Sequence, residues 1–352
     1  MNLALIDAIA KTVLYEGYML YPYRPSAVKN RQRWNFGVLY PRVYSEAQLG
    51  TDAWTMQTEC VVEGSAQSAL EVRVRFLRLV QRSVLQLRTP TTDPDEHTES
   101  QLVEKLEVDG RVFQPWQEAV EQEVCLPPLN LGLLCLQACE QKCILPRNGE
   151  FEQVRDNREQ VVAMIHRERA ALDGFVRVSA EMLQDGIFKI QILIRNETTA
   201  DCAPGLSRDA ALLQSLISAH TVMGIRAGAF VSAVDPPESL AGHIQNCRNI
   251  GAWPILVGDE QLHDTMLCSP IILYDFPKIA PESAGDLFDG TEIDEILSLR
   301  IMTLTEDEKR EIRQSDQRAR ELLQRTETLP ADQWRKLHGV LRELRPLKGE
   351  PL

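Results

Sequence analysis

The stretch LEVRVRF, residues 70–76, carries the clearest secondary-structure signal in the chain. Its apolar side chains stand at even-numbered positions and its charged side chains at odd-numbered ones. Alternation with a period of two places one face of a strand in a core and the other face in water. The stretch therefore predicts a half-buried β-strand, and we interpret residues 15–88 around it mainly as strands.

A second strand signal lies in FVRVSAEMLQDGIFKIQILI, residues 175–194. Residues 175–182 and 188–194 both alternate between apolar and polar side chains. Asp185-Gly186 lies between them, and this pair readily adopts the positive φ angles of a tight turn. The stretch predicts an antiparallel hairpin. Further strands are expected at 102–126, 222–232, 253–257 and 270–274.

Other segments have patterns that are typical of helices. Ser207 can cap a helix, and Thr305 with Glu308 forms a capping box at the start of the C-terminal region. Pro330 suits the first turn of a final helix. Helices are also expected at 2–14, 129–143, 152–172 and 237–247. The predicted fold class is therefore α+β, with a strand-rich N-terminal half, a mixed second half that contains the hairpin, and a helical C-terminus.

The length of 352 residues suggests two domains, since a domain usually has roughly 100–200 residues. We place the division near residue 150. The first predicted domain, 1–150, is mainly β and includes an exposed acidic loop, TPTTDPDEHTES, at 89–100. The second, 151–352, is α+β and ends in charged helices over 291–345.

Bulk composition restricts the class of protein. The net charge of -13 argues against a general nucleic-acid binder, which needs clustered lysine and arginine. The 8 cysteines are spread along the chain, as expected for free thiols in a reducing compartment. No run of about 20 apolar residues could cross a membrane, and the N-terminus lacks the features of a secretory signal. We therefore expect a cytoplasmic protein without membrane insertion.

Three longer stretches are informative together. They are LYEGYMLYPYRPSAVKNRQRWNFGVLYP at 14–41, NCRNIGAWPILVGD at 246–259, and SPIILYDFPKIAPESAGDLFDGTEIDEILSLRIMTLTEDEK at 269–309. In this order they resemble a bacterial protein family encoded in NiFe-hydrogenase gene clusters, of the type associated with high-affinity, oxygen-tolerant hydrogen oxidation. The resemblance implies a pathway and leaves the mechanism open.

Residues 15–42 form a basic and aromatic patch within this acidic chain. Five cationic side chains stand against one acidic side chain, and the six aromatic residues that follow Tyr15 are interleaved with them. Arginine with tyrosine or tryptophan is the composition of interface hot spots. Two alternatives stay open: the aromatic rings belong to a core under solvated arginines, or the patch binds nucleic acid. The candidate partner-binding residues are Tyr23, Arg24, Lys29, Arg31, Arg33 and Trp34.

Cys135, Cys139 and Cys143 are spaced four residues apart. On a helix over 129–143 their thiols would form one stripe, which could hold a soft metal ion or part of an iron–sulfur cluster. The spacing matches no standard cluster or zinc motif. The alternative is that they are small core residues among leucines, and no cofactor is favoured. A second possible zinc ligand set comprises His243, Cys247, His263 and Cys268.

The segment 275–308 is acidic. Asp289 and Glu292 have the spacing of a capping box, which explains their charges by helix stability alone. Alternatively, Asp275 joins them in a carboxylate site for a metal ion or for acid–base catalysis. The loop lacks the regular spacing of a calcium-binding hand.

The chain lacks the phosphate loop, the dinucleotide fingerprint, the zinc-protease helix motif and the nucleophile elbow. We therefore expect an accessory or assembly protein that binds a NiFe-hydrogenase subunit or a maturation factor, without catalysis of its own. One alternative is a metal-handling or redox protein that uses the three spaced cysteines. The other is an enzyme with the carboxylate site. The C-terminal helices could also dock a second copy of the chain.

Overall fold

The computed structural model describes residues 36–94, 98–199 and 205–277, together with positions 306, 309, 313, 320, 323, 324, 327 and 328. The structure is 55% strand and 12% helix, with one large antiparallel sheet and short helices. The predicted α+β class is therefore wrong. The predicted helical C-terminus is not shown by the structure, because residues 291–345 lie outside the described residues apart from those eight positions.

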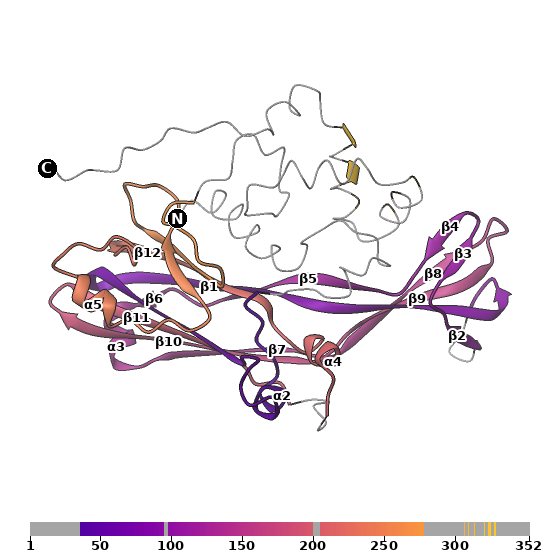
Figure 1. The fold of residues 1–352 in the computed structure, drawn as a ribbon, viewed down its shortest axis with the longest axis horizontal. Helices are drawn as coiled ribbons and strands as arrows, with labels where there is room; N and C mark the ends of the chain where they lie inside the picture. The colour runs from indigo at the N-terminus through magenta and orange to yellow at the C-terminus, as the bar shows by residue number, and fades with distance from the viewer. Residues whose placement is uncertain are drawn as a thin grey trace, which may run out of the picture.

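One strand, β1 (Thr55–Thr91), runs through the whole architecture (Figure 1). The alternating stretch 70–76 lies at its centre, so the strand predicted there is confirmed. Every even-numbered residue from 70 to 84 is buried. Because side chains alternate between the faces of a strand, one face of β1 stays covered over this whole length. A strand of 37 residues is several times longer than the usual five or six.

Eleven further strands of the described chain join β1 in one sheet. They are β2 (Ser100–Leu102), β5 (Trp116–Cys125), β6 (Leu129–Asn130), β7 (Cys139–Leu145), β8 (Asn148–Arg155), β9 (Val161–Arg169), β10 (Leu172–Gln184), β11 (Ile187–Asn196), β12 (Ile217–Phe230), β13 (Trp253–Leu256) and β14 (Thr265–Ser269). A separate hairpin pairs β3 (Leu106–Val108) with β4 (Arg111–Phe113). The short helices are α2 (Arg42–Ala47), α3 (Leu131–Leu136), α4 (Arg208–Leu212) and α5 (Ala241–Gln245).

The neighbours of β1 change along its length. Residues 55–63 pair with β11, and residues 62–77 pair with β12. Residues 81–91 then pair with β9, while β5 runs along residues 73–82. The sheet folds into two layers at one end of the molecule and continues as a thinner arm of β1, β2, β8 and β9 at the other end (Figure 1).

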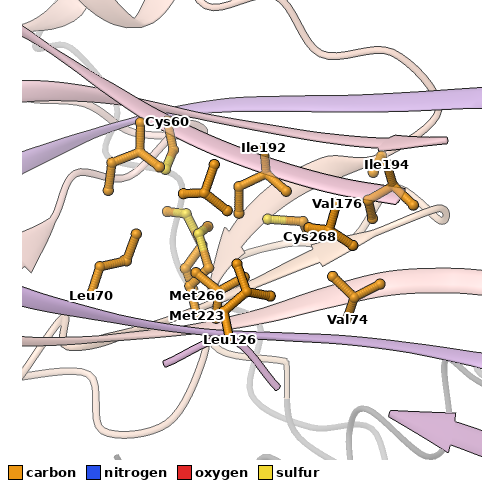
Figure 2. Close-up of a cluster of buried hydrophobic side chains, with 14 of the residues drawn as sticks. Cys60, Leu70, Val74, Leu126, Val176, Ile192, Ile194, Met223, Met266 and Cys268 are labelled. Carbon is orange, nitrogen blue, oxygen red and sulfur yellow. The ribbon is translucent and has the colours of Figure 1, made fainter. Parts of the chain in front are cut away.

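The main core fills the space between the two layers. Figure 2 shows Cys60, Ile192 and Val176 on one layer, facing Leu70 and Met223 on the other. All five side chains are buried in the same cluster. Because burial of one such aliphatic side chain contributes about 1.5–3 kcal/mol, this cluster is the main source of stability. The arm has a smaller core, in which Val108 of the hairpin packs beside β8 and β9.

The hairpin prediction and two local details are confirmed. β10 and β11 pair from Gly174↔Asn196 to Gln184↔Ile187, and Gly186 in the turn has a φ of +75°. The hydroxyl of Ser207 accepts a hydrogen bond from the backbone N–H of Ala210 and so caps α4. α5 occupies part of the helix expected at 237–247.

Two predicted helices are wrong. Residues 152–172 form the second half of β8, all of β9 and the start of β10, because their arginines and glutamates pair across neighbouring strands. Residues 129–143 contain α3 only as far as Leu136, and Gln137 already has extended backbone angles. The strand expected at 270–274 is also wrong, because β14 ends at Ser269 and residues 270–274 form no strand. Residue 150 lies within β8, and β1 pairs with strands on both sides of it; the two-domain division stays a prediction.

Arg78 lies where the two-layer region becomes the arm. It directly follows Leu77, the last residue of β1 that pairs with β12, and it precedes Gln81, the first that pairs with β9. Its side chain is on the buried face of β1, and the residue is only 5% exposed. Nη2 donates hydrogen bonds to the backbone oxygens of Pro146 (2.7 Å) and Ala170 (2.5 Å). Pro146 lies between β7 and β8, and Ala170 between β9 and β10, so one guanidinium joins both strand junctions.

Burial lowers the pKa of Arg78, and the nearby Arg169 guanidinium acts in the same direction. In the described residues no carboxylate forms an ion pair with Arg78, and its Nε has no hydrogen-bond partner. A buried cation that is bound only by carbonyls is costly unless those bonds stabilise something else. Here they fix two strand breaks at the place where regular pairing changes.

We expect Arg78→Met to lower the free energy of unfolding. Each charge-assisted hydrogen bond contributes about 1.5–3 kcal/mol, and relief of the buried charge offsets part of the loss, so the net decrease should be about 2 kcal/mol. Urea denaturation measures it. The matched control is Arg88→Met on the same strand, where the arginine side chain is 65% exposed and pairs with Glu99. A decrease no larger than that of the control would show that Arg78 does not support the junction.

His220 is a second buried ionisable group. It lies on β12 opposite Arg75 and is completely buried. Its Nδ1 lies 2.9 Å from the carbonyl oxygen of Ser218, while Nε2 has no partner. Burial lowers the pKa of His220 to about 4, and Arg75 adds to this effect. The Ser218 carbonyl, Glu123 and Glu121 act in the opposite direction.

The free energy of unfolding should therefore fall in mild acid. The pKa of His220 is about 6.5 in the unfolded chain and about 4 in the folded one. The part of the folding stability that requires a neutral His220 is therefore fully present above pH 6.5 and is lost as the pH falls toward 4. The shift corresponds to a loss of about 3 kcal/mol. Urea denaturation of the wild type and of His220→Gln, compared at pH 7 and pH 4.5, measures it. Equal losses in the two proteins would contradict the assignment to His220.

Candidate functional site

The predicted partner-binding residues at 23–34 lie outside the described residues. The same basic and aromatic patch continues into the structure at Phe36, Tyr40 and Arg42. These residues lead into α2, whose N-terminal neighbour is Pro41. The described part of the site is therefore built around this short helix (Figure 1).

The inner side of α2 is aromatic and buried. Tyr40 and Tyr44 have ring centroids 5.3 Å apart and pack against Ala211 of α4. Because Tyr40 is buried, the core interpretation of the aromatic residues holds at this position. Sequence alone could not separate Tyr40 from Arg42, whose side chain is exposed, although the two lie only two residues apart.

Asp52 organises the polar groups behind the helix. Its Oδ2 accepts a hydrogen bond from the hydroxyl of Tyr44 at 3.3 Å, and its Oδ1 pairs with Nη2 of Arg208 at 3.3 Å. The Arg208 guanidinium also lies over the ring of Tyr40, 5.6 Å from its centroid. Burial, with Asp52 second, raises the pKa of Tyr40 to about 12, so its phenol stays neutral. These contacts fix α2 and α4 to each other.

The outer side of α2 presents a different set of side chains. Arg42 lies over the indole of Trp54 at 4.8 Å and pairs with Glu46 at 2.7 Å. Arginine stacked on tryptophan is prealigned, so it loses little freedom when a partner binds. We define the α2 surface as Arg42, Val43, Leu49, Trp54 and Arg208.

Leu49 is the most unusual member of the α2 surface. It follows the end of α2, where Gly50 N–H donates to Ser45 O (3.0 Å) and Leu49 N–H donates to Glu46 O (3.2 Å). This pair of bonds is the Schellman motif, which places the residue corresponding to Leu49 in the left-handed region. The φ of Leu49 is +56°, at a position where glycine is usual. Its side chain is nevertheless 94% exposed.

A leucine in this conformation costs about 1 kcal/mol or more relative to glycine, because its Cβ crowds the following carbonyl. The exposed side chain recovers none of this cost within the chain. Energetic strain at an exposed apolar residue is a feature of binding sites, where a partner covers the side chain. Sequence reasoning missed Leu49, since its φ depends on the hydrogen bonds that end α2.

The three spaced cysteines do not form a stripe. Cys135 is exposed on α3, whereas Cys139 and Cys143 lie on β7 and pack partly against the main core. Residues four apart on a strand are separated by about 13 Å, too far to share one ion. Burial raises the pKa of the thiols of Cys135 and Cys143, which disfavours the thiolate that a metal needs.

The second cysteine and histidine set is likewise not brought together. Cys268 is fully buried in the main core, and burial raises its pKa to about 12. Cys247 packs beside α5, and burial raises its pKa to about 11. Within residues 36–94, 98–199 and 205–277, no group of three or more histidine, cysteine, aspartate or glutamate side chains could hold a metal ion.

Asp275 has a structural role. Its Oδ2 accepts a hydrogen bond from the hydroxyl of Ser232 at 2.5 Å, and its Oδ1 accepts one from the backbone N–H of Leu256 at 2.7 Å. The carboxylate thus ties the segment after β14 to β13. Asp289 and Glu292, the other members of the predicted carboxylate site, lie outside the described residues.

No protein-family model matches this chain, and no curated protein matches it. Among the described residues, no helix is long and apolar enough to cross a membrane.

We expect Leu49→Gly to raise the free energy of unfolding by about 1 kcal/mol, because glycine adopts the left-handed region without strain. Leu49→Ala is the control: it removes the exposed side chain but keeps a Cβ, so its stability should stay close to that of the wild type. Urea denaturation of the three proteins distinguishes them. A glycine variant no more stable than the alanine variant would mean that Leu49 is not strained.

Proposed function

We propose that this protein is a non-catalytic accessory protein that binds another protein through the α2 surface. The observation that supports this most is Leu49, an exposed leucine in a conformation that favours glycine. A partner that buries this side chain offsets the strain with the free energy of apolar burial, about 1.5–3 kcal/mol for a leucine.

Other members of the α2 surface suit an interface. Arginine and tryptophan dominate interface hot spots, and here Arg42 is already stacked on Trp54. Arg208 adds a second exposed guanidinium, held by Asp52. A rigid surface with one apolar anchor and two oriented cations favours a protein partner that offers an apolar pocket beside carboxylates.

The proposed partner is a NiFe-hydrogenase subunit or a maturation factor. Support comes from the resemblance of residues 14–41, 246–259 and 269–309 to the family encoded with such hydrogenases. The first of these stretches runs directly into α2. We propose the cytoplasm as the site of action, and the seven described cysteines, all of them free, fit its reducing conditions.

Affinity purification from cells that make the hydrogenase tests this function. The wild type should retain a hydrogenase subunit or maturation factor. Leu49→Ala and Leu49→Gly should each weaken this binding about tenfold, since each removes the buried anchor. Leu102→Ala, which removes an exposed leucine from the arm, should bind like the wild type.

The two Leu49 variants separate binding from folding, because the glycine variant should be more stable and yet bind less. Wild-type protein that retains no hydrogenase or maturation protein would contradict the proposed partner. Unchanged binding by both Leu49 variants would contradict the proposed surface.

A further inference from the structure

β7 is an edge strand. It ends the order β13-β14-β12-β1-β11-β10-β7, and it pairs with β10 from Cys139↔Val178 to Leu145↔Leu172. No strand in the described part of the chain pairs with its other edge. An open edge presents backbone N–H and C=O groups that can pair with another chain.

The side chains of β7 are unusually accessible. Glu140, Gln141 and Lys142 are exposed, and Ile144 is 68% exposed. The backbone oxygen of Lys142 accepts a hydrogen bond from the side-chain amide of Gln141 at 2.9 Å. A carbonyl that points away from β10 needs such a substitute donor. Because backbone groups alternate along a strand, those of Glu140 and Ile144 point to the same open edge.

The sequence of β7 is self-complementary. Residues 139–143 are Cys-Glu-Gln-Lys-Cys, with opposite charges at equal distances from Gln141. In an antiparallel pair of two copies centred on Gln141, each Glu140 lies directly opposite Lys142 of the second copy. Opposite charges at such positions stabilise strand pairs, and like charges destabilise them. The same register places the exposed Ile144 opposite Ala138 of the second copy, which covers an apolar side chain.

The exposed edge strand of the arm shows the reverse pattern. β8 pairs only with β9 among the described strands, and its residues 150–152 are Glu-Phe-Glu. Two copies centred on Phe151 would bring Glu150 against Glu152 and repel. Glu150 pairs with Arg169 and Glu152 with Arg167, just as Glu140 of β7 pairs with Arg177 at 3.7 Å, so the two strands differ in the order of their charges. The charges therefore oppose pairing at β8 and favour it at β7.

We infer that two copies of this chain associate along β7, antiparallel and related by a two-fold axis at Gln141. The pairing extends the sheet of one copy into the sheet of the other. A symmetric dimer of this kind uses the same strand in both subunits, so it closes without leaving a free strand edge at the contact. The inference does not depend on the α2 surface or on its partner.

Site-specific cross-linking tests the two-fold axis. In the dimer residue 141 lies opposite itself, so Gln141→Cys should form a disulfide between two copies when diamide oxidises the thiols. Peptide mass spectrometry should identify the 141–141 link. Gln153→Cys, on the exposed edge of β8, is the matched control and should give no such link at residue 153. Equal linkage at both positions, or none at 141, would overturn the register.

Charge reversal tests the complementarity. Glu140→Lys and Lys142→Glu each bring like charges together at two places, so each should weaken dimerisation about tenfold in Kd. The double variant restores opposite charges and should recover most of the wild-type affinity. Sedimentation equilibrium measures the Kd, and thermal melting confirms that every variant folds. A monomeric wild type, or a double variant no better than the single ones, would overturn the inference.

Discussion

The two hydrogen bonds of Arg78 lie at the point on which the architecture depends. β1 is continuous through this region, and β5 pairs with it along residues 73–82. On the other edge of β1 the neighbour changes, because pairing with β12 stops at Leu77 and pairing with β9 starts at Gln81. The carbonyl oxygens of Pro146 and Ala170 belong to the two strand breaks that this change requires. A single guanidinium bonds both, because its planar fork has donors enough for two acceptors. The free energy that is lost by burying the Arg78 charge is therefore needed to keep β1 continuous from the two-layer region into the arm.

Because β1 is continuous, the α2 surface and the β7 edge belong to one structure built on a single sheet. The α2 surface lies beside the two-layer region, and β7 forms the edge of the sheet. Both features present groups that the monomer leaves incompletely satisfied: a strained leucine in one case and an open strand edge in the other. Such groups have a lower free energy when a partner covers them. We propose that the α2 surface binds a different protein and that the β7 edge pairs with a second copy of the chain.

The sequence predicted what local patterns determine. Alternation revealed the centre of β1 and the hairpin of β10 and β11, and Ser207 marked the start of α4. It did not reveal the length of β1, because Arg78 and Arg82 occupy its buried face and interrupt the apolar pattern. Arg82 is compensated by Glu118 on β5, a contact that no local pattern encodes. β9 resembled a charged helix for a similar reason: its charged side chains, such as Arg167, pair with residues of other strands, and no local pattern shows this. The strain at Leu49 could not be predicted from the sequence, since it arises from the hydrogen bonds that end α2.

The central claim is that β1 is one stable unit through the junction at Arg78. The protection of its backbone amides against hydrogen exchange tests this claim most directly. Protection of the amides at residues 77–82 should equal that at 70–76, in the middle of the two-layer region. The amides at the end of β9 and those at the start of β10, on the two sides of Ala170, should exchange equally slowly. Fast exchange confined to 77–82, with slow exchange on either side, would show two regions joined by a hinge and would contradict the role given to Arg78.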